Sequence, residues 1–309
     1  MTMRFEEIQI GRRAILQGSV LLLGAASLPL SQPTDLWADK SKTSVRFGLV
    51  TDLHFADKPT GGSRHYRESV DKLTEAAAAF EEASLDFVVE LGDLIDAAAS
   101  IELELTYLKT INNIFGSIKA DKHYVLGNHC VTTLNKQEFL GAVERSDSYY
   151  SFDTGETHFV VLDACFRKDG EPYGHKNFNW TDTAIPATEL EWLKGDLAST
   201  KKKTVVLAHQ RLDVTNQHGV KNSPDVRKIL EEAGNVAAVF QGHSHANEYR
   251  DINGIHYCTM VAMVEGSGKE NSGYSILEVA ASGAIKIDGF RKQKDYSWKP
   301  RSASLPVDS

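Results

Sequence analysis

Residues 45–54 read VRFGLVTDLH, a short apolar run that ends in an aspartate and a histidine two positions apart. Short apolar runs rich in β-branched residues are typical of buried strands. The same arrangement, an apolar run followed closely by polar side chains, recurs further along the chain. The later polar clusters are Gly92-Asp93, Gly127-Asn128-His129, His209 and Gly242-His243-Ser244-His245.

The segments between these clusters alternate between strand and helix patterns in the first half of the chain. Expected strands there cover residues 45–51, 86–91 and 122–126, and expected helices cover 64–83, 101–118 and 135–144. The second half is richer in strands. It has an expected hairpin over 149–152 and 158–162, helices over 189–197 and 225–233, and strands over 204–208, 236–241, 249–251, 255–260, 274–279 and 284–287. A βαβ half followed by a strand-rich half predicts an α/β protein with two facing sheets and helices outside.

The position of the polar clusters relative to the expected strands indicates a single site. Each cluster falls at the carboxyl end of an apolar run or within three residues of it. In open α/β sheets, ligands bind in the crevice beyond the carboxyl ends of the strands. We therefore expect the loops that carry these clusters to converge on one point.

The residue types in these clusters are metal ligands, and no cysteine thiolate is among them. Two adjacent metal ions need roughly seven protein ligands, one of which bridges both ions. Asp93 is short and anionic, which makes it the natural bridge. Asp52, His54 and His245 can bind one ion, and Asn128, His209 and His243 the other. A water molecule shared by two dications becomes a hydroxide near neutral pH, and this chemistry suits the hydrolysis of phosphate esters.

Composition limits the class of partner. The 309 residues carry a net charge of −8, with 41% hydrophobic and 25% charged residues, as in an ordinary soluble protein. The acidity argues against a nucleic-acid polymer or an anionic membrane surface as the main partner, whereas metal ions can still attract a small phosphate ester. Cys130, Cys165 and Cys258 form no CxxC pair and predict no disulfide framework.

The first 38 residues differ from the rest. Arg12-Arg13 precede an interrupted apolar stretch over residues 14–30, which resembles a twin-arginine export signal with Ala38 before the cleavage site. The alternative is an uncleaved amphipathic anchor at the N-terminus. We expect a signal peptide over residues 1–38, a linker over 39–44, one catalytic domain over 45–292 and a C-terminal tail over 293–309. The expected location is therefore the periplasm or the exterior.

The ordered series Asp-x-His, Gly-Asp-x-x-Asp, Gly-Asn-His, His and Gly-His-x-His resembles the calcineurin-like metallophosphoesterase superfamily. The resemblance spans residues 47–260. It implies a four-layer α/β/β/α sandwich of two mixed sheets flanked by helices. It also implies metal ligands at Asp52, His54, Asp93, Asn128, His209, His243 and His245.

A narrower resemblance joins three stretches, FGLVTD over residues 47–52, RHYR over 64–67 and ELGD over 90–93. They are similar to the manganese-dependent ADP-ribose/CDP-alcohol diphosphatase group, although members of that group often carry Gln where this chain has His54. The resemblance implies hydrolysis of a phosphodiester or diphosphate bond in a small, nucleotide-linked substrate. The implied cofactors are two divalent ions, with Mn²⁺ favoured over Fe or Zn²⁺.

His129 has a separate role, because it follows the predicted ligand Asn128. By resemblance it lies near the leaving-group oxygen as a proton donor or transition-state stabiliser, which makes it a catalytic residue beside the bridging Asp93. The family usually has an acidic residue next, and this chain has Cys130, whose thiol cannot hold a cationic imidazole as a carboxylate would. Either another carboxylate replaces it or the acid is less well oriented. Asp96 is expected to support the metal loop from behind the ligands.

Substrate contacts are harder to assign. Arg64, His65 and Tyr66 open an expected helix and could bind a phosphate or nucleoside, with a solvated helix start as the alternative. Arg211 could neutralise substrate charge or form a surface ion pair. The long loop over residues 173–180 could bind substrate or cover the sheet edge.

Two other functions compete with the diester or diphosphate hydrolase. One is a phosphomonoesterase of the alkaline-phosphatase type. The other is a non-catalytic binding module on the same fold, and loss of Asp93 or His209 would mark it. Both residues are present.

Overall fold

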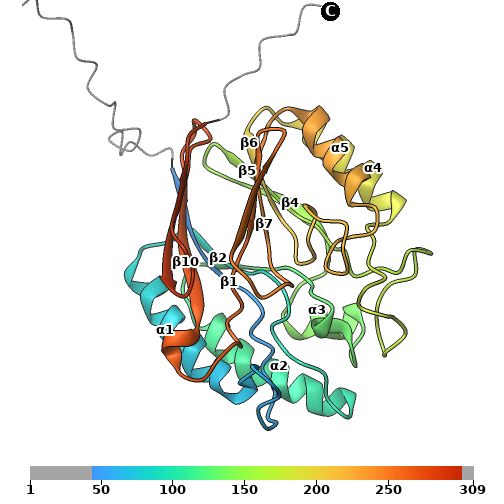
Figure 1. Ribbon diagram of the computed structural model, residues 1–309, viewed down its shortest axis with the longest axis vertical. Coiled ribbons are helices and arrows are strands. Elements are labelled where there is room, and N and C mark those ends of the chain that lie inside the picture. The colour runs from blue at the N-terminus through green and yellow to red at the C-terminus, as the bar shows by residue number, and fades with distance from the viewer. Residues whose placement is uncertain (1–43, 301–309) are drawn as a thin grey trace, which may run out of the picture. The chain divides into compact units, whose positions relative to one another are not determined.

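The computed structural model describes residues 44–300, which form two six-stranded sheets flanked by helices (Figure 1). The expected signal peptide, the linker up to residue 43 and the tail after residue 300 lie outside the described residues. The structure confirms the predicted α/β class and its four layers.

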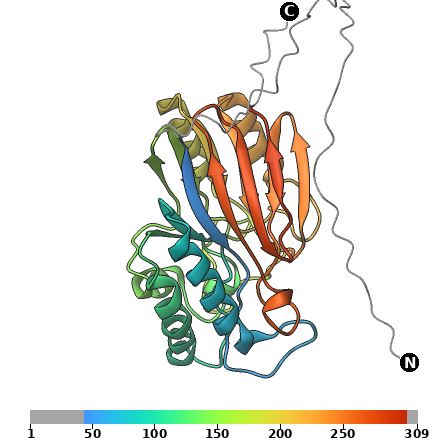
Figure 2. The ribbon, with the colours of Figure 1, turned by 90° about the vertical axis from the view of Figure 1, so that its left-hand side faces the viewer.

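The first sheet has the order β12-β11-β10-β1-β2-β3. Its strands are β1 (Val45–Val50), β2 (Phe87–Glu90), β3 (Asp121–Tyr124), β10 (Gly273–Val279), β11 (Ile285–Arg291) and β12 (Tyr296–Trp298). Strands β1, β2 and β3 are parallel, whereas β10, β11 and β12 continue the sheet antiparallel from β1. Figure 2 shows β1 side by side with β10, from the far end of the chain.

The second sheet has the order β4-β5-β6-β7-β9-β8. Its strands are β4 (Tyr150–Thr154), β5 (Thr157–Val161), β6 (Lys203–Leu207), β7 (Val236–Gln241), β8 (Glu248–Ile252) and β9 (Ile255–Thr259). The four central strands are parallel and the two edge strands, β4 and β8, are antiparallel to their neighbours. Both sheets are thus mixed, as predicted.

The helices cover the outer faces of the two sheets. Helices α1 (Ser69–Glu82), α2 (Ile101–Gly116) and α3 (Lys136–Ala142) share one core cluster with the outer face of the first sheet, and α4 (Ala187–Ser199) and α5 (Ser223–Ala233) share another with the second (Figure 1). Among residues 44–300, no helix combines the length and apolar character that a membrane crossing requires.

An aromatic cluster holds the two sheets face to face. Phe47 of β1 stacks on Phe87 of β2, with ring centroids 4.8 Å apart, and meets the edge of Phe159 of β5 at 5.5 Å. All of these rings are buried. Aromatic pairs in such arrangements stabilise a core beyond the area that they bury. The contact fixes the carboxyl ends of β1 and β2 opposite those of the second sheet.

The structure corrects two predicted boundaries. The helix expected from residue 64 begins at Ser69, because Arg64 forms backbone bridges with Gly61 and Glu265 and is held in an extended loop. The domain also continues past residue 292, since β12 pairs with β11 and Trp298 stacks on His256 of the other sheet at 4.7 Å. The short Tyr-Ser-Trp alternation is too brief to stand out in the sequence.

Candidate metal centre

The polar clusters of both sheets meet beyond the carboxyl ends of their strands. Asp52 and His54 follow β1, and Asp93 follows β2. The other residues that the sequence predicts as ligands come from loops after β3, β6 and β7, namely Asn128, His209, His243 and His245. Asp52, His54 and His209 are fully buried, and Asp93, Asn128 and His243 are at most 9% exposed.

Distances among these side chains define two separate groups and a third that overlaps both. Asp52, His54 and His245 place one ligand atom each within 4.8 Å of one another, and so do Asp93, His209 and His243. The third group is His54, Asp93 and His129, which shares one residue with each of the others. The Oδ2 atom of Asp93 lies 3.1 Å from His209 Nε2 and 3.5 Å from His54 Nε2. One carboxylate oxygen therefore faces an imidazole of each group, which is the position that a bridging ligand needs.

The hydrogen bonding of these groups fits metal ions. Asn128 Oδ1, His209 Nε2 and His243 Nε2 are buried and have no hydrogen-bond partner, although buried polar atoms normally have one. His209 Nδ1 donates to the Leu91 carbonyl at 2.9 Å, so its Nε2 keeps a lone pair for a cation. Imidazole, carboxylate and amide donors suit Mn²⁺, Fe or Zn²⁺.

The backbone at this centre is strained. The φ angles of Asp52, His54, Asp93, His243 and His245 lie between 45° and 70°. Residues other than glycine rarely adopt this left-handed region, and such strain persists only where the surrounding structure enforces it. It turns successive side chains of each loop toward the same point.

Two glycines make room for the carboxylates. A Cβ atom on Gly127 would lie 2.8 Å from Asp93 Cγ, and one on Gly242 would lie 2.7 Å from Asp52 Oδ2. Both distances are shorter than van der Waals contact. The glycines of the Gly-Asn-His and Gly-His-x-His motifs are therefore needed for close approach.

The buried carboxylates govern the charge of the surrounding imidazoles. Burial opposes protonation of His209 and His245. The charges of Asp93 and Asp52 outweigh burial at His209, and the charge of Asp52 outweighs it at His245. The pKa of each imidazole therefore rises to about 9. Burial and the neighbouring His209 instead lower the pKa of His243 to about 3. Without cations, protons compensate the carboxylates, so metal binding must displace them.

His129 is oriented by the carboxylate of Asp96 and not by its sequence neighbour Cys130. Its Nδ1 lies 2.7 Å from Asp96 Oδ1, and its ring meets the edge of the His54 ring at 4.4 Å. Cys130 points into the core and is fully buried. Asp96, the last residue of the Gly-Asp-x-x-Asp motif, thus takes the place that Cys130 leaves empty. Burial opposes its charge, but His129 and Lys58 hold the pKa of Asp96 well below its usual range.

Two further residues around the centre escaped the sequence analysis. Lys58 Nζ donates to Asp96 Oδ2 at 2.9 Å, and Glu265 Oε1 lies 2.5 Å from His245 Nδ1. The buried Lys72 donates to the carbonyls of Met263, Glu265 and Gly266, which anchors the loop that carries Glu265. In the sequence, only its place in the glycine-rich stretch after β9 could have indicated a role for Glu265.

The residues predicted to contact substrate divide into two groups. Arg64 lies near the first group of ligands, since it forms a backbone bridge with Glu265, whose Oε1 lies 2.5 Å from His245 Nδ1. Close to it, His65 Nδ1 lies 2.9 Å from Glu68 Oε1, and Lys58 Nζ lies 4.1 Å from the centre of the Tyr66 ring.

Arg211, in contrast, is buried in a network of its own. It pairs with Asp213 and Glu248 at 2.7 and 2.8 Å and donates to Ser244 Oγ at 3.2 Å. Its charge is compensated inside the protein, and it secures the loop between His243 and His245. This is an ion pair, as in the alternative reading of the sequence, but a buried one.

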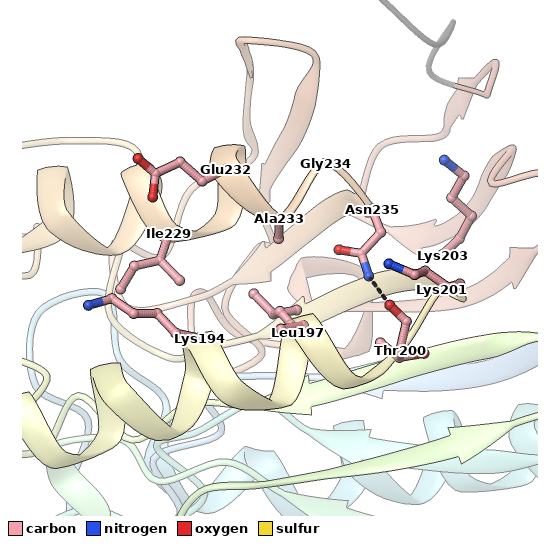
Figure 3. A pocket seen from close by; sticks show the side chains of 11 residues that line it. Lys194, Leu197, Thr200, Lys201, Lys203, Ile229, Glu232, Ala233, Gly234 and Asn235 are labelled. Carbon is pink, nitrogen blue, oxygen red and sulfur yellow. Dashed lines mark hydrogen bonds between the residues drawn. The ribbon is translucent and has the colours of Figure 1, made fainter.

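One hollow of the described residues lies away from the metal centre. It has a volume of about 640 Å³ and is lined by the ends of α4 and α5, including Lys194, Leu197, Lys201 and Asn235 (Figure 3). None of the predicted site residues lines it. Chemistry and geometry therefore place the functional site at the metal centre and not in this hollow.

Comparisons with known proteins agree with this geometry. Residues 45–247 match the calcineurin-like phosphoesterase family. The chain is 25% identical over 268 residues to a manganese-dependent ADP-ribose/CDP-alcohol diphosphatase of Arabidopsis thaliana, covering 71% of this chain and 86% of the relative. A diphosphatase of the same name from Danio rerio is 24% identical over 284 residues, covering 71% of this chain and 87% of the relative.

A solved structure shares the fold. The crystal structure of a dimetal phosphatase from Danio rerio superposes with a TM-score of 0.74 at 18% identity, covering 84% of this chain and 99% of that one.

Substitution of the shared carboxylate should affect both metal positions. We expect Asp93→Ala to reduce the metal content of both positions, because Asp93 Oδ2 lies 3.1 Å from His209 Nε2 and 3.5 Å from His54 Nε2. Asp52→Ala should weaken mainly one position, because Asp52 Oδ1 lies closer to His245 Nε2, at 3.4 Å, than to His209 Nε2, at 3.8 Å. Elemental analysis of the purified proteins measures this, with the exposed Asp225→Ala as the control. Retention of the full wild-type metal content by Asp93→Ala would contradict the shared position.

Substitution of Glu265 should weaken metal binding without removing a ligand. Glu265→Gln keeps the shape but loses the charge that orients His245, and loss of such a partner typically costs about 10- to 100-fold in metal affinity. Titration calorimetry with Mn²⁺ measures the change. Glu270→Gln, an exposed residue of the same loop, is the matched control, and equal affinity of the two variants would refute the role of Glu265.

Proposed function

The chain belongs to the calcineurin-like phosphoesterase family and is a metal-dependent phosphoester hydrolase, and on that premise we propose that it cleaves a phosphodiester or diphosphate bond in a small, nucleotide-linked substrate. The observation that carries the proposal is the single Asp93 oxygen that faces an imidazole of each ligand group. Two cations that shared this oxygen would suit displacement at phosphorus. The names of the two diphosphatase relatives support the substrate class.

The proposed cofactors are two divalent ions, with Mn²⁺ favoured over Fe or Zn²⁺. Both relatives are named as manganese-dependent, and the nitrogen and oxygen donors of this chain accommodate that ion. Asp52, His54, Asp93 and His245 would hold one ion, and Asp93, Asn128, His209 and His243 the other. When bound, such ions neutralise phosphate charge and supply an activated water, hydroxide-like near neutral pH, for the attack.

His129 is the proposed proton donor to the leaving-group oxygen. Asp96 holds its Nδ1, which leaves Nε2 for the substrate, and its side chain is 26% exposed beside His54. Lys58 fixes the other oxygen of Asp96 and so limits rotation of the carboxylate. Asp96 and Lys58 together keep the His129 imidazole in one orientation as the proton moves.

Arg64 is the proposed contact for the phosphate group that does not react. It lies near His245, and within residues 44–300 no carboxylate lies within ion-pair distance of its guanidinium. A guanidinium can bind a phosphate through two parallel hydrogen bonds, which favours a diphosphate over a simple monoester.

We also infer export through the twin-arginine route, so that the working location is the periplasm or the exterior. The inference rests on Arg12-Arg13 ahead of a moderately apolar run. This route carries folded proteins, which would allow metal loading in the cytoplasm.

A substrate and metal screen tests the proposed activity. The purified chain should hydrolyse ADP-ribose faster than bis-para-nitrophenyl phosphate or para-nitrophenyl phosphate, and faster with Mn²⁺ than with Zn²⁺ or iron. A preference for the monoester with every metal would overturn the substrate class and favour a phosphomonoesterase.

The leaving group should reveal the role of His129. His129→Ala should impair substrates with poor leaving groups by about 100-fold or more, while activated nitrophenyl esters, which need little protonation, should suffer much less. Steady-state kinetics over a series of esters measures the contrast. An equal loss for every leaving group would instead make His129 an electrostatic or positioning residue.

The export signal needs its own test. Replacement of both Arg12 and Arg13 by Lys should block export and leave folded protein in the cytoplasm, because the route requires the arginine pair. Fractionation of cells followed by immunoblotting measures the distribution. Unchanged export of the double-lysine variant would refute the twin-arginine route.

A further inference from the structure

Trp180 is an exposed aromatic residue beside the metal centre. Only Leu103, Trp180 and Tyr249 are large hydrophobic residues that remain exposed within residues 44–300, and Trp180 is 37% exposed. Leu103 belongs to α2 and Tyr249 to β8. Trp180 alone among the three contacts a predicted metal ligand, since its ring centroid lies 5.5 Å from that of His243.

His218 completes a small aromatic surface with Trp180. Its ring lies 5.5 Å from Trp180 at an interplanar angle of 41° and 5.6 Å from His243. The three rings come from three separate loops, after β5, β6 and β7. His218 Nδ1 is buried and has no hydrogen-bond partner within the described residues.

The loop that carries Trp180 has one part that packs on the core and one part that is exposed to solvent. Tyr173 is buried and stacks on Phe178 at 3.7 Å, which makes this part a cover of the core. Asn179 then forms a turn, because its carbonyl accepts from Asp182 N at 2.8 Å and its side chain accepts from Thr181 N at 3.1 Å. The turn holds Trp180 out of the core in a defined position.

An aromatic ring held in water beside a catalytic centre points to a ligand. Ligand sites are lined mainly by hydrophobic and aromatic side chains with a few polar groups, and Trp180 lies beside such polar groups. A planar group stacked on Trp180 would lie one ring away from His243, close enough to remain joined to a phosphate at the metal centre. Arg211 near His218 is already compensated by Asp213 and Glu248, so the surface offers π faces but no free charge for a second phosphate.

We propose that Trp180 and His218 form a stacking platform for the nucleobase of the substrate. The proposal rests on the proposed function and deepens it by assigning the two ends of the substrate. The base lies over Trp180 on the side of His243, and the phosphate beyond the cleaved bond lies toward Arg64 on the side of His245. Because every base has a π face, the platform selects for a base without reading its identity.

Kinetics of Trp180 variants test the platform. Stacking on an aromatic side chain contributes about 1–3 kcal/mol per base, so Trp180→Ala should lower kcat/KM about 10-fold or more for both ADP-ribose and a CDP-linked alcohol. A diphosphate diester with an aliphatic alcohol at each end should be cleaved at an unchanged kcat/KM. Trp180→Phe should restore most of the loss. Tyr249 on β8 is as exposed as Trp180. Tyr249→Ala is therefore the matched control, and it should leave kcat/KM unchanged for all of these substrates.

Equilibrium binding separates failure of the platform from failure of the proposed function. Calorimetry of the Mn²⁺-loaded chain should show that Trp180→Ala weakens AMP about 10-fold and leaves ribose 5-phosphate unchanged. If the wild type cleaves no diphosphate, the proposed function fails, and AMP binding alone decides on the platform. If diphosphates are cleaved but Trp180→Ala lowers kcat/KM equally for the nucleotide-linked and the aliphatic diphosphates, or for neither, the platform is wrong and the function stands.

Discussion

The whole centre depends on the burial of two carboxylates that the protein does not neutralise with lysine or arginine. Asp52 and Asp93 are buried, and the groups that face them are imidazoles, the Thr51 hydroxyl and the backbone N–H groups of His129 and His243. Removal of unpaired carboxylates from water is unfavourable enough that they require cations. In the metal-free chain, protons on His209 and His245 meet this need, which is why their pKa rises to about 9. Divalent ions would compensate the carboxylates with more charge, and the neutral imidazoles would bind them through their nitrogen lone pairs.

The fold brings these carboxylates and imidazoles together from distant parts of the chain. Aromatic contacts between the sheets align the carboxyl ends of β1 and β2 with those of β6 and β7, so loops from both sheets meet. The loops then store strain in left-handed residues such as Asp93 and His243. The close approach of backbone at Gly127 and Gly242 leaves no room for a larger residue. Geometry for metal binding is thus built into the backbone before any ion arrives.

Sequence patterns predicted which side chains converge, because each predicted ligand is tied to a strand end by a short motif. Asp52 and His54 share one loop, and strand order places that loop beside Asp93. Partners that depend on tertiary contacts left no such pattern. The contacts of Asp96 with His129, of Glu265 with His245 and of Lys58 with Asp96 join residues 20 to 38 positions apart. The burial of Arg211 and the pairing of β12 likewise follow from packing, since neither the charge nor the short Tyr-Ser-Trp stretch indicates its surroundings.

The central claim is that one carboxylate is shared by two ions, and anomalous diffraction from crystals grown with Mn²⁺ tests it most directly. The account predicts two anomalous peaks about 3.5–4 Å apart, as in other two-metal hydrolytic sites, with the Asp93 carboxylate in contact with both. A single peak, or two peaks of which Asp93 contacts only one, would contradict it.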